Sequence, residues 1–261
     1  MDDDQNIAAA GEIRELTGFL KAADSGGLVV FTGAGISAES GIPTYRGVGG
    51  MWSRYDPEKY ASIDYFRRDP SYYWRFFKEV RMEMMTSAAP SPAHLAVAEL
   101  EAAGMVAAVI TQNIDGLHQK AGSRRVLELH GNTLRFYCFD CRDPYTMEDI
   151  KRQLETLEIP VCGKCRGVLR PDVVLFGEML PDDVVQEAQI AAGNCQALLV
   201  IGSSLVVYPA AHLPYQAKLA GARLGIINMD PTPLDSLADL RCFCPAGATL
   251  PPAVKALAAG V

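Results

Sequence analysis

Two cysteine pairs have the spacing of a metal site. Cys138 with Cys141 and Cys162 with Cys165 form two Cys-x-x-Cys pairs, with twenty residues between them. Each short loop directs two sulfur atoms to one point, and Gly163 stands where a tight turn is needed, so four thiolates can surround one Zn²⁺. Two disulfides are the alternative, which a reducing compartment disfavours. We predict a structural zinc ribbon, because four thiolates leave no open coordination position for catalysis.

A glycine-rich segment has residues suited to binding a phosphate group. The apolar run 28–31 leads into TGAGISAESGIPTYRG, which contains Gly33-x-Gly35-x-x-Ala38, one form of the dinucleotide-binding fingerprint. Because glycine has no side chain, we expect the backbone N–H groups of Gly33, Ala34 and Gly35 to face a pyrophosphate. An ordinary strand-to-helix turn is the alternative for so short a motif.

The residues after this loop differ from those of a hydride-transfer enzyme. Such an enzyme has a second strand that ends in an acidic residue about 20 positions on, where it holds the adenosine ribose. Here the chain runs through Pro43, Gly47, Gly49 and Gly50 into the aromatic segment MWSRYDPEKY. We predict a flap over about 36–60 that closes over a ligand, and not a dehydrogenase.

Polar residues end several other apolar runs. TQNID, ELHGN, GSS and INMD occupy 111–115, 128–132, 202–204 and 227–230. Ligands of open α/β sheets bind outside the carboxyl ends of strands, so we expect these ends to converge. His130 is the candidate for acid–base chemistry, because imidazole titrates near neutral pH, and a structural histidine is the alternative. Asn113 and Asp115 leave a strand at alternate positions, or they cap the helix after it.

The other cysteines and histidines show no ligand spacing. We expect Cys195, Cys242 and Cys244 to be buried thiols that pack as small apolar residues. His94 and His118 lie within helical patterns, which indicates packing or hydrogen bonding at helix ends.

A parallel sheet must position these residues. Apolar runs rich in β-branched residues alternate with helical patterns, which is typical of a parallel sheet covered on both faces. The predicted strands are 28–31, 106–111, 126–129, 173–176, 197–202 and 223–228. The predicted helices are 11–24, about 69–86, 92–103, 181–193, 208–221 and one that begins at Pro252. We predict an α/β fold, a Rossmann-like parallel sheet with helices on both faces plus a small inserted zinc-ribbon domain.

The zinc segment divides the chain. We predict a Rossmann-like domain at 1–130 and 172–261 and a zinc-binding module at 131–171, with the flap contributing to the small domain. No internal repeat or low-complexity linker separates the parts, so we expect one compact unit with a ligand cleft between them.

Composition excludes several classes of protein. The 261 residues are 49% apolar and 21% charged, enough to bury a large core, which argues against disorder. No apolar run approaches the roughly 20 residues of a membrane span, and the N-terminal residues are acidic where a secretory signal is basic, so we predict a cytoplasmic protein without a membrane partner. A net charge of −7 argues against a nucleic-acid partner and suits a basic polypeptide.

The ordered motifs resemble the sirtuin family of NAD-dependent protein-lysine deacylases. TGAGISAESGIPTYRG, TQNIDGLHQKAG, ELHGN, the two cysteine pairs, FGE, GSSLVVYPA and INMDPTP occur in this order from about residue 26 to 250. The resemblance implies that NAD⁺ and an acyl-lysine meet between the Rossmann-like domain and the zinc module. One departure lies in the flap, where the commonest family form is Gly-Ile-Pro-Asp-Phe-Arg and this chain has Thr44 and Tyr45 before Arg46. The family phenylalanine shields the reactive carbon, and the ring of Tyr45 keeps that role plausible.

The resemblance also implies a mechanism. The oxygen of acetyl-lysine attacks C1′ of the nicotinamide ribose and expels nicotinamide, and His130 then acts as general base on a ribose hydroxyl so that it attacks the resulting imidate. The acetyl group leaves on ADP-ribose, so NAD⁺ is consumed and not reduced. Asn113 and Asp115 position a water and the nicotinamide carboxamide, and Gln112 contacts the ribose.

Two sets of binding residues are implied by the resemblance. The cofactor-binding set is Gly33, Ala34, Gly35, Ser37, Glu39, Tyr45, Arg46, Gln112, Asn113, Asp115, Gly202, Ser203, Ser204, Asn228, Asp230 and Ala246. We expect the substrate to bind as an extended strand between the segments 174–178 and 204–208. The substrate-binding set is Ile114, Val174, Phe176, Gly177, Glu178, Val206 and Val207, and core packing is the alternative for Ile114, Val174 and Phe176.

Residues of the helix after the flap indicate which acyl group is removed from the substrate lysine. Sirtuins that remove succinyl or malonyl groups bind the acyl carboxylate with a Tyr and an Arg three residues apart. Alignment through DPSYYWRFFKEV places Phe77 and Val80 there, which predicts a preference for acetyl and other neutral groups, because an unpaired buried carboxylate is costly. A shifted alignment would use Tyr72 and Arg75 instead.

Three classes of function stay open at this point. The first is the deacetylase, with deacylation of other acyl groups as a variant, the second is an NAD-dependent protein mono-ADP-ribosyltransferase, and the third is a non-enzymatic zinc-ribbon binding module. His130, Asn113 and Asp115 argue against the third, and the ribbon has no basic patch that would read nucleic acid.

Overall fold

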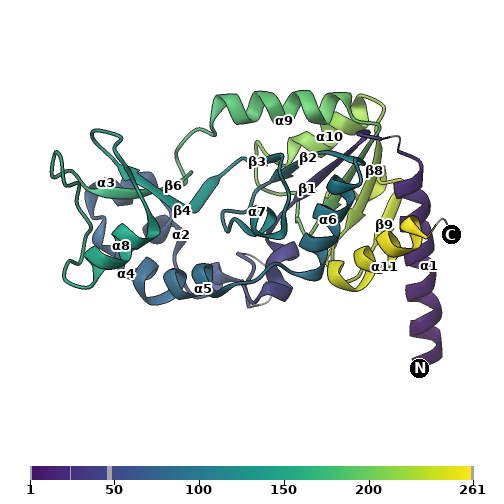
Figure 1. The fold of residues 1–261 in the computed structure, drawn as a ribbon, viewed down its shortest axis with the longest axis horizontal. Coiled ribbons are helices and arrows are strands. Elements are labelled where there is room, and N and C mark those ends of the chain that lie inside the picture. Colours follow the sequence, from purple (N-terminus) through teal and green to yellow (C-terminus); the bar gives the residue numbers. More distant parts are fainter. Residues whose placement is uncertain (1, 24, 46–48, 260–261) are drawn as a thin grey trace.

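A computed structural model describes residues 2–23, 25–45 and 49–259, with side chains from residue 10 onward. Arg46, predicted to contact the cofactor, lies outside the described residues. Figure 1 shows a large lobe built on one sheet. A smaller lobe of short helices and strands lies beyond β3 (Val126–Glu128), the strand at one edge of that sheet.

The large lobe is built on a six-stranded sheet in the order β3-β2-β1-β7-β8-β9, in which every pairing is parallel. The strands are β1 (Leu28–Thr32), β2 (Val106–Thr111), β3 (Val126–Glu128), β7 (Ala197–Ile201), β8 (Arg223–Ile227) and β9 (Leu240–Cys242). The chain moves outward from β1 to β3 and then returns to start again beside β1, so the order reverses between β1 and β7, as in a Rossmann fold. The predicted fold class is confirmed.

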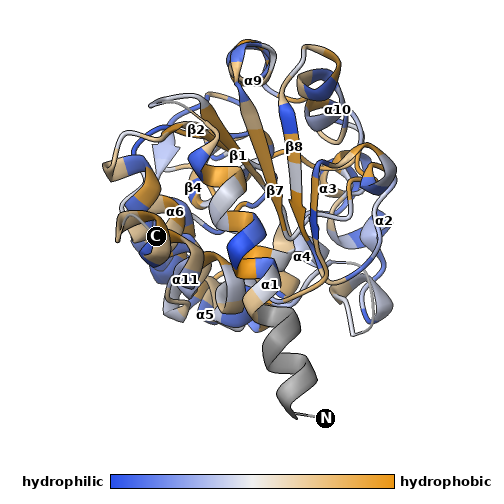
Figure 2. Cartoon of the chain, turned by 90° about the vertical axis from the view of Figure 1, so that its right-hand side faces the viewer, coloured by the Kyte–Doolittle hydropathy of each residue, from blue (hydrophilic) through white to orange (hydrophobic). Residues whose placement is uncertain are grey.

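Alternating strand residues face two layers of helices. Leu28 and Val30 pack against α1 (Asp2–Lys21), α6 (Pro92–Ala102) and α11 (Ala246–Ala258). Val29 and Phe31 pack on the other face with α9 (Asp182–Asn194) and α10 (His212–Leu219). Figure 2 shows β1 and β7 coloured as hydrophobic between these layers, and β8 hydrophobic over only part of its length. Because both faces are covered, the strands are continuous apolar runs, which is why the sequence revealed them.

Several predicted bounds in the large lobe are wrong, among them those of the first helix, which was predicted at 11–24 and is observed as α1 at Asp2–Lys21. Strand β9 was missed because its three residues, Leu-Arg-Cys, carry too little pattern. Helix α11 begins at Ala246, six residues before the predicted start, and contains Pro251 and Pro252. Proline removes helix hydrogen bonds. The burial of Leu250, Ala253 and Val254 against the core compensates for that loss.

The small lobe has its own antiparallel sheet, in the order β5-β4-β6. Its strands are β4 (Gly131–Cys138), β5 (Pro144–Tyr145) and β6 (Leu169–Val173). The predicted strand 173–176 is therefore wrong, because β6 ends at Val173, which pairs with Gly131 of β4 and not with the parallel sheet. Four apolar residues in a row do not distinguish a sheet strand from a buried loop.

Short helices complete the small lobe. They are α2 (Pro57–Tyr60), α3 (Ile63–Arg68), α4 (Ser71–Phe76), α5 (Met82–Ser87) and α8 (Met147–Leu154), with a π-helical turn η3 (Phe77–Arg81) between α4 and α5. Trp74 donates to the carbonyl of Leu169 at 3.1 Å and stacks on Phe136, so the helices after the flap share one core with the ribbon. Helix α7 (Leu117–Ala121) and the 3₁₀ turns η1 (Ala34–Ser40), η2 (Met51–Ser53) and η4 (Asp235–Leu237) lie in connections.

Candidate active site and metal centre

Three glycines let two loops touch at the carboxyl end of the sheet. The loops come after β1 and β7, where the strand order reverses. A Cβ on Gly35 would lie 2.6 Å from the Cα of Gly202, and one on Gly33 would lie 2.8 Å from the Gly202 oxygen. Gly202 itself has φ of +64°. The glycines therefore permit a close approach of two backbones at the place where open α/β sheets bind ligands.

This contact corrects the prediction for the glycine amides. The Gly33 N–H donates to Ile201 O at 3.1 Å and the Gly35 N–H donates to Gly202 O at 2.8 Å, so neither is free for a pyrophosphate. Ala34 opens the 3₁₀ turn η1, where an N–H has no partner within the turn. Of the three amides, that of Ala34 keeps the predicted role.

Gly202→Ala is expected to lower the free energy of unfolding by about 2–4 kcal/mol. An alanine would have to adopt a left-handed conformation, and its Cβ would lie 2.3 Å from the Ile36 nitrogen. Gly193→Ala is the matched control, because Gly193 lies in α9 with nothing within 4 Å, and it should leave the protein equal in stability or up to about 1 kcal/mol more stable. Urea unfolding of both variants measures the difference, and equal stabilities would contradict it.

A buried polar group joins the loops after β1 and β2. Ser37 donates to Asp115 Oδ2 at 2.7 Å, and the side-chain amide of Asn113 donates to Ser37 Oγ and to Gly33 O, both at 3.1 Å. Burial raises the pKa of Asp115, while the Leu117 N–H and the Ser37 hydroxyl oppose the shift. Asp115 accepts from the Leu117 N–H at the start of α7 at 2.9 Å, but the N-cap position of this helix is Gly116, so neither Asp115 nor Asn113 is its N-cap residue, and Asn113 holds the glycine loop.

His130 lies immediately before β4, at the junction of the two lobes. Its Nδ1 lies 3.0 Å from the carbonyl oxygen of Gln112. A carbonyl only accepts, so Nδ1 carries the proton and Nε2 is the basic nitrogen of the neutral ring. Burial lowers the pKa of His130 below 6.5, and the bond to Gln112 opposes this shift without cancelling it. The imidazole is therefore neutral at physiological pH and able to accept a proton.

The rate of any reaction in which His130 acts as the general base is expected to fall in acid, with a midpoint below pH 6.5. A general base must be neutral, and burial of His130 means that a higher proton concentration is needed to charge it than for an exposed imidazole, whose pKa is 6.5. The pH profile of kcat/KM, together with an NMR titration of the His130 ring, measures both values. An inactivation midpoint above 6.5, or an NMR pKa above it, would contradict the expectation.

The next strand ends supply further polar atoms. Gln112 donates through Nε2 to Ser203 Oγ at 2.8 Å, which ties the loops after β2 and β7, while Ser204 is exposed. Asn228 donates to Asp230 O at 2.7 Å in the loop after β8. Arg241, which the sequence analysis missed, donates to the carbonyls of Asn228 and Asp230 at 2.9 and 2.8 Å and so fixes this loop.

Glu39 and Ala246 meet at the start of α11. The Glu39 carboxylate accepts from the N–H of Gly247 at 2.8 Å, where a helix N-terminus favours a negative charge. Ala246 is buried at the same helix end. Glu39 thus links the glycine loop to α11, and its contact with the cofactor stays a prediction.

The flap is held by aromatic contacts. Tyr45 lies 5.2 Å from Trp52, ring to ring, and Trp52 lies 6.4 Å from Phe176. The backbone N–H of Trp52 donates to the backbone carbonyl oxygen of Tyr45 at 3.0 Å. The predicted shielding residue Tyr45 and the predicted substrate residue Phe176 are therefore joined through one indole ring.

The loop 174–178 is fixed on one side. The Val174 N–H donates to His130 O at 3.0 Å, and Phe176 pairs with 61–63. Glu178 accepts from both terminal nitrogens of Arg170, at 2.7 and 2.8 Å, and from the Leu175 N–H. Burial alone would raise the pKa of Glu178, but Arg170 and Leu175 hold it below its usual value. The Glu178 carboxylate therefore fixes its own loop, and its contact with the substrate stays a prediction.

Exposed apolar side chains flank this loop. Phe176 lies in the loop 174–178 and Met179 directly after it, and Val206 and Tyr208 lie in the segment 204–208. These four side chains are exposed, while Val207 is half-buried. Gly177 has φ of +93°, which bends its segment. Core packing is therefore excluded for Phe176, whereas Ile114 and Val174 are half-buried.

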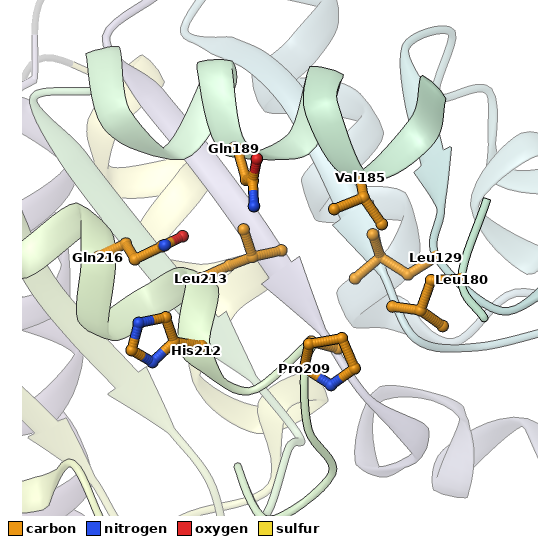
Figure 3. A pocket seen from close by; sticks show the side chains of 9 residues that line it. Leu129, Leu180, Val185, Gln189, Pro209, His212, Leu213 and Gln216 are labelled. Carbon is orange, nitrogen blue, oxygen red and sulfur yellow. The ribbon is translucent and has the colours of Figure 1, made fainter. Parts of the chain in front are cut away.

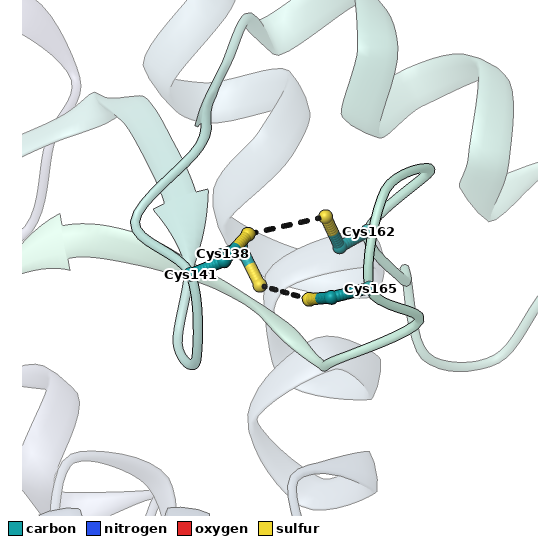
Figure 4. A group of neighbouring side chains, drawn as sticks. All are labelled: Cys138, Cys141, Cys162 and Cys165. Atoms are coloured by element: carbon teal, nitrogen blue, oxygen red, sulfur yellow. Dashed lines mark hydrogen bonds between the residues drawn. The ribbon is translucent and has the colours of Figure 1, made fainter.

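Four cysteine sulfur atoms converge at the tip of the small lobe. Cys138 and Cys165 approach to 3.4 Å, Cys141 and Cys162 to 3.6 Å, and all four lie within 4.8 Å of one another (Figure 4). Tetrahedral Zn²⁺ with bonds of about 2.3 Å requires sulfur separations of about 3.8 Å, so the four residues fit the metal and would hold it. Gly163 lies in a turn, as predicted, and the left-handed residues of the two knuckles are Arg142 and Arg166, each directly after the second cysteine of its pair.

The remaining cysteines and histidines take structural places. His94 forms a capping box with Ser91, and His118 shares a hydrogen bond of 2.9 Å with Thr32, as expected for helix-end residues. Burial lowers the pKa of His94 to about 4 and that of His118 to about 3. Cys242 is fully buried, and Cys195 and Cys244 are half-buried, which corrects the expectation of full burial for the last two.

A small cavity lies outside this site, between α9 and α10. Figure 3 shows Leu129, Val185 and Leu213 directed into it. Its volume of about 70 Å³ is well below the several hundred Å³ of small-molecule sites.

The described helices include none that is long and apolar enough to cross a bilayer.

The fold and the site define an α/β protein of the dinucleotide-binding class that carries a four-cysteine ribbon. The Sir2 family model matches residues 33–209. The NAD-dependent protein deacylase 2 of Archaeoglobus fulgidus is 52% identical over 245 residues, 94% of this chain and 95% of that protein. The NAD-dependent protein deacetylase of Thermotoga maritima is 46% identical and is matched over 82% of this chain and 86% of its own.

Solved structures agree with these relatives. A Sir2 complex with a p53 peptide and NAD⁺ superposes with a TM-score of 0.85 at 40% identity, over 95% of this chain and 98% of that chain. A second Sir2 enzyme structure has a TM-score of 0.88 at 50% identity, over 96% and 99%. The chain belongs to the Sir2 family.

Proposed function

We propose that this protein is an NAD⁺-dependent protein-lysine deacetylase that transfers the acetyl group of acetyl-lysine to ADP-ribose and releases nicotinamide. The observation that carries the proposal is His130, a neutral, half-buried imidazole whose Nδ1 is tied to Gln112 beside the Asn113–Asp115 group. Relatives named NAD-dependent protein deacylase 2 and NAD-dependent protein deacetylase match most of the chain.

NAD⁺, as co-substrate, would supply the electrophilic ribose carbon. Asn113 and Asp115 would orient the nicotinamide end, because both are buried and already ordered by Ser37. Gln112 and Ser203 would face the ribose, and Asn228 with Asp230 the adenosine end. His130 would take a ribose hydroxyl proton on Nε2, since Nδ1 is occupied.

The acetylated polypeptide would bind as a strand between 174–178 and 204–208. The exposed apolar residues Phe176, Val206 and Tyr208 of these segments, and Met179 directly after the first of them, support this. Sir2 structures bound to acetylated peptide and to a p53 peptide have TM-scores of 0.84 and 0.85 against this chain. Backbone pairing tolerates many side chains, which suits an enzyme with many protein substrates.

Zinc at the four cysteines would be structural, with the small domain made of 131–171 and the flap. We extend that domain to the helices between 57 and 87, because their aromatic residues share the ribbon's core. Four reduced thiols suit the cytoplasm, where we place the protein.

One assay separates the deacetylase from the ADP-ribosyltransferase. The protein is incubated with an acetyl-lysine peptide and NAD⁺, and the products are identified and quantified by mass spectrometry. The deacetylase yields free lysine peptide, nicotinamide and acetylated ADP-ribose in equal amounts. A peptide or protein that gains the mass of ADP-ribose, with no acetylated ADP-ribose, would replace the proposal by the transferase.

A further inference from the structure

Two cysteines at the end of the last strand of the large sheet face the same side of the chain. Strand β9 ends at Cys242, which is fully buried, Phe243 is exposed, and Cys244 is half-buried. Because side chains alternate between two faces in extended chain, the two sulfur atoms lie on one side and the phenyl ring on the other. Both cysteines pack against the core cluster that α1 and α11 cover. They therefore form a pair of neighbouring thiols.

The two thiols differ in acidity because each acts on the other. A hydrogen bond between the Cys242 and Cys244 side chains lowers the pKa of Cys244 and raises the pKa of Cys242, which burial raises further. Burial and the Glu12 carboxylate of α1 oppose the shift of Cys244 without cancelling it. Cys244 is also the more accessible of the two. A partly exposed thiol with a lowered pKa is the one that an oxidant attacks first.

Cys242 supports the loop that is proposed to hold the adenosine of NAD⁺. Its carbonyl oxygen accepts from the Asn228 N–H at 3.1 Å and from Nη1 of Arg241. The same guanidinium donates to the carbonyls of Asn228 and Asp230 at 2.9 and 2.8 Å. The loop after β8 thus depends on the position of the backbone at Cys242.

Cys244 lies at the entry to α11. Its sulfur atom lies 3.2 Å from the hydroxyl oxygen of Thr249, near the start of that helix. Ala246, a predicted cofactor contact, opens the helix, and the N–H of Gly247 donates to Glu39 of the glycine loop. A displacement of the Cys244 sulfur therefore acts on the part of α11 that faces the proposed cofactor site.

We propose that Cys242 and Cys244 form a redox-sensitive site, in which hydrogen peroxide closes a disulfide and thereby weakens the binding of NAD⁺. This inference rests on the proposed function for the identity of the ligand. The Cys244 thiolate attacks one peroxide oxygen, the O–O bond breaks, and a sulfenic acid and one water form. The Cys242 sulfur then displaces the sulfenic oxygen as a second water. Two S–H bonds are replaced by one S–S bond, both sulfur atoms are oxidised, and the peroxide is reduced.

The geometry of a disulfide explains the effect on NAD⁺. A disulfide places two Cα atoms about 4.4–6.8 Å apart, and two residues of extended chain span about 6.6–7.2 Å, so closure bends the end of β9. The Cys244 sulfur must leave Thr249, and the Cys242 carbonyl must turn with the bend. A ring that spans a single residue is strained, and strained disulfides are readily reduced. The bridge is therefore reversible, and both thiols are reduced until an oxidant is present.

Peroxide treatment of the zinc-loaded protein tests the site. Trypsin releases residues 242–255 as one peptide, which contains these two cysteines and no other. We expect this peptide to lose the mass of two hydrogen atoms and to stop reacting with N-ethylmaleimide, while a zinc indicator shows that the metal is retained. The affinity for NAD⁺, measured by calorimetry, should fall about tenfold, the scale of one or two lost hydrogen bonds. Dithiothreitol should restore it.

Three variants separate the site from the other thiols. Cys244→Ser should form no bridge and keep its affinity for NAD⁺ in peroxide. Cys242→Ala should stop at a sulfenic acid on Cys244, which dimedone traps, because the second thiol is missing. Cys195→Ser, which changes a half-buried thiol on the other side of the sheet, should respond to peroxide as the wild type does.

Each contrary result has its own meaning. A 242–255 peptide that remains fully alkylated after peroxide overturns the inference and leaves the proposed function intact, as does a bridge that leaves the affinity for NAD⁺ unchanged. A zinc-retaining Cys244→Ser variant that loses affinity in peroxide as the wild type does also overturns it. Reduced wild-type protein that binds no NAD⁺, whether or not the bridge forms later, contradicts the proposed function instead.

Discussion

His130→Ala is expected to reduce deacetylation by about 10²-fold or more while NAD⁺ binding stays within a few-fold of wild type. The imidazole is held by one bond, from Nδ1 to Gln112 O at 3.0 Å, and is neutral because burial lowers its pKa. Alanine removes the base. The contact between the glycine loops after β1 and β7 and the hydrogen bond from Ser37 to Asp115 do not depend on the imidazole ring. The loss should therefore fall on kcat.

His212→Ala is the matched control. His212 lies at the start of α10, is exposed and contacts Tyr215, away from the proposed site. It should keep full activity. Single-turnover rates and NAD⁺ affinity by calorimetry separate chemistry from binding. A His130→Ala enzyme with near wild-type turnover would show that the proton goes to another group.

Loss of zinc is expected to unfold the small lobe and abolish activity. Cys162→Ser should release the metal and lower stability by several kcal/mol, because a closed four-thiolate site contributes its binding energy directly to folding. The four sulfur atoms join the turn after β4 to the turn before β6. His130 precedes β4 and loop 174–178 comes after β6, so both lose their support when the ribbon opens.

Metal analysis and thermal unfolding measure this effect. The native protein should contain one zinc per chain, and a strong chelator should lower its melting temperature. Cys195→Ser, which changes a half-buried thiol in the large lobe, should alter neither. Native protein without zinc, or full activity after replacement of two of the four cysteines, would refute the structural role.

Long regular patterns predicted the large lobe well. Strands β1, β2, β7 and β8 agree with the predicted runs to within one residue at each end, because fully buried parallel strands are continuously apolar. Helices α6 and α9 were found for a related reason, since their periodic faces are long enough to detect. The short strand β9 and the run at 173–176 failed, because a few apolar residues fit a strand, a loop or a buried turn equally well.

The candidate site was predicted by residue type but not by role. His130, Asn113, Asp115 and Gln112 were found and do lie together, because they end strands that share one edge of the sheet. The partners of Glu39 and Glu178 within the chain, the N–H of Gly247 and the guanidinium of Arg170, were not predicted, because such contacts cannot be recognised from spacing.

The sequence by itself determined the features that depend on local chemistry: the thiolate spacing, the glycines of the loops and the alternation of strands and helices. The tertiary structure alone decided which distant groups meet. The Glu39 carboxylate accepts a hydrogen bond from Gly247 at the start of α11, 208 residues away. The π-helical turn Phe77–Arg81 buries the side chain of Arg81, whereas the alignment had selected the preceding residue, Val80. Pairing over such separations depends on the packing of the whole chain, since burial decides the energy of a charge and burial is a property of the fold.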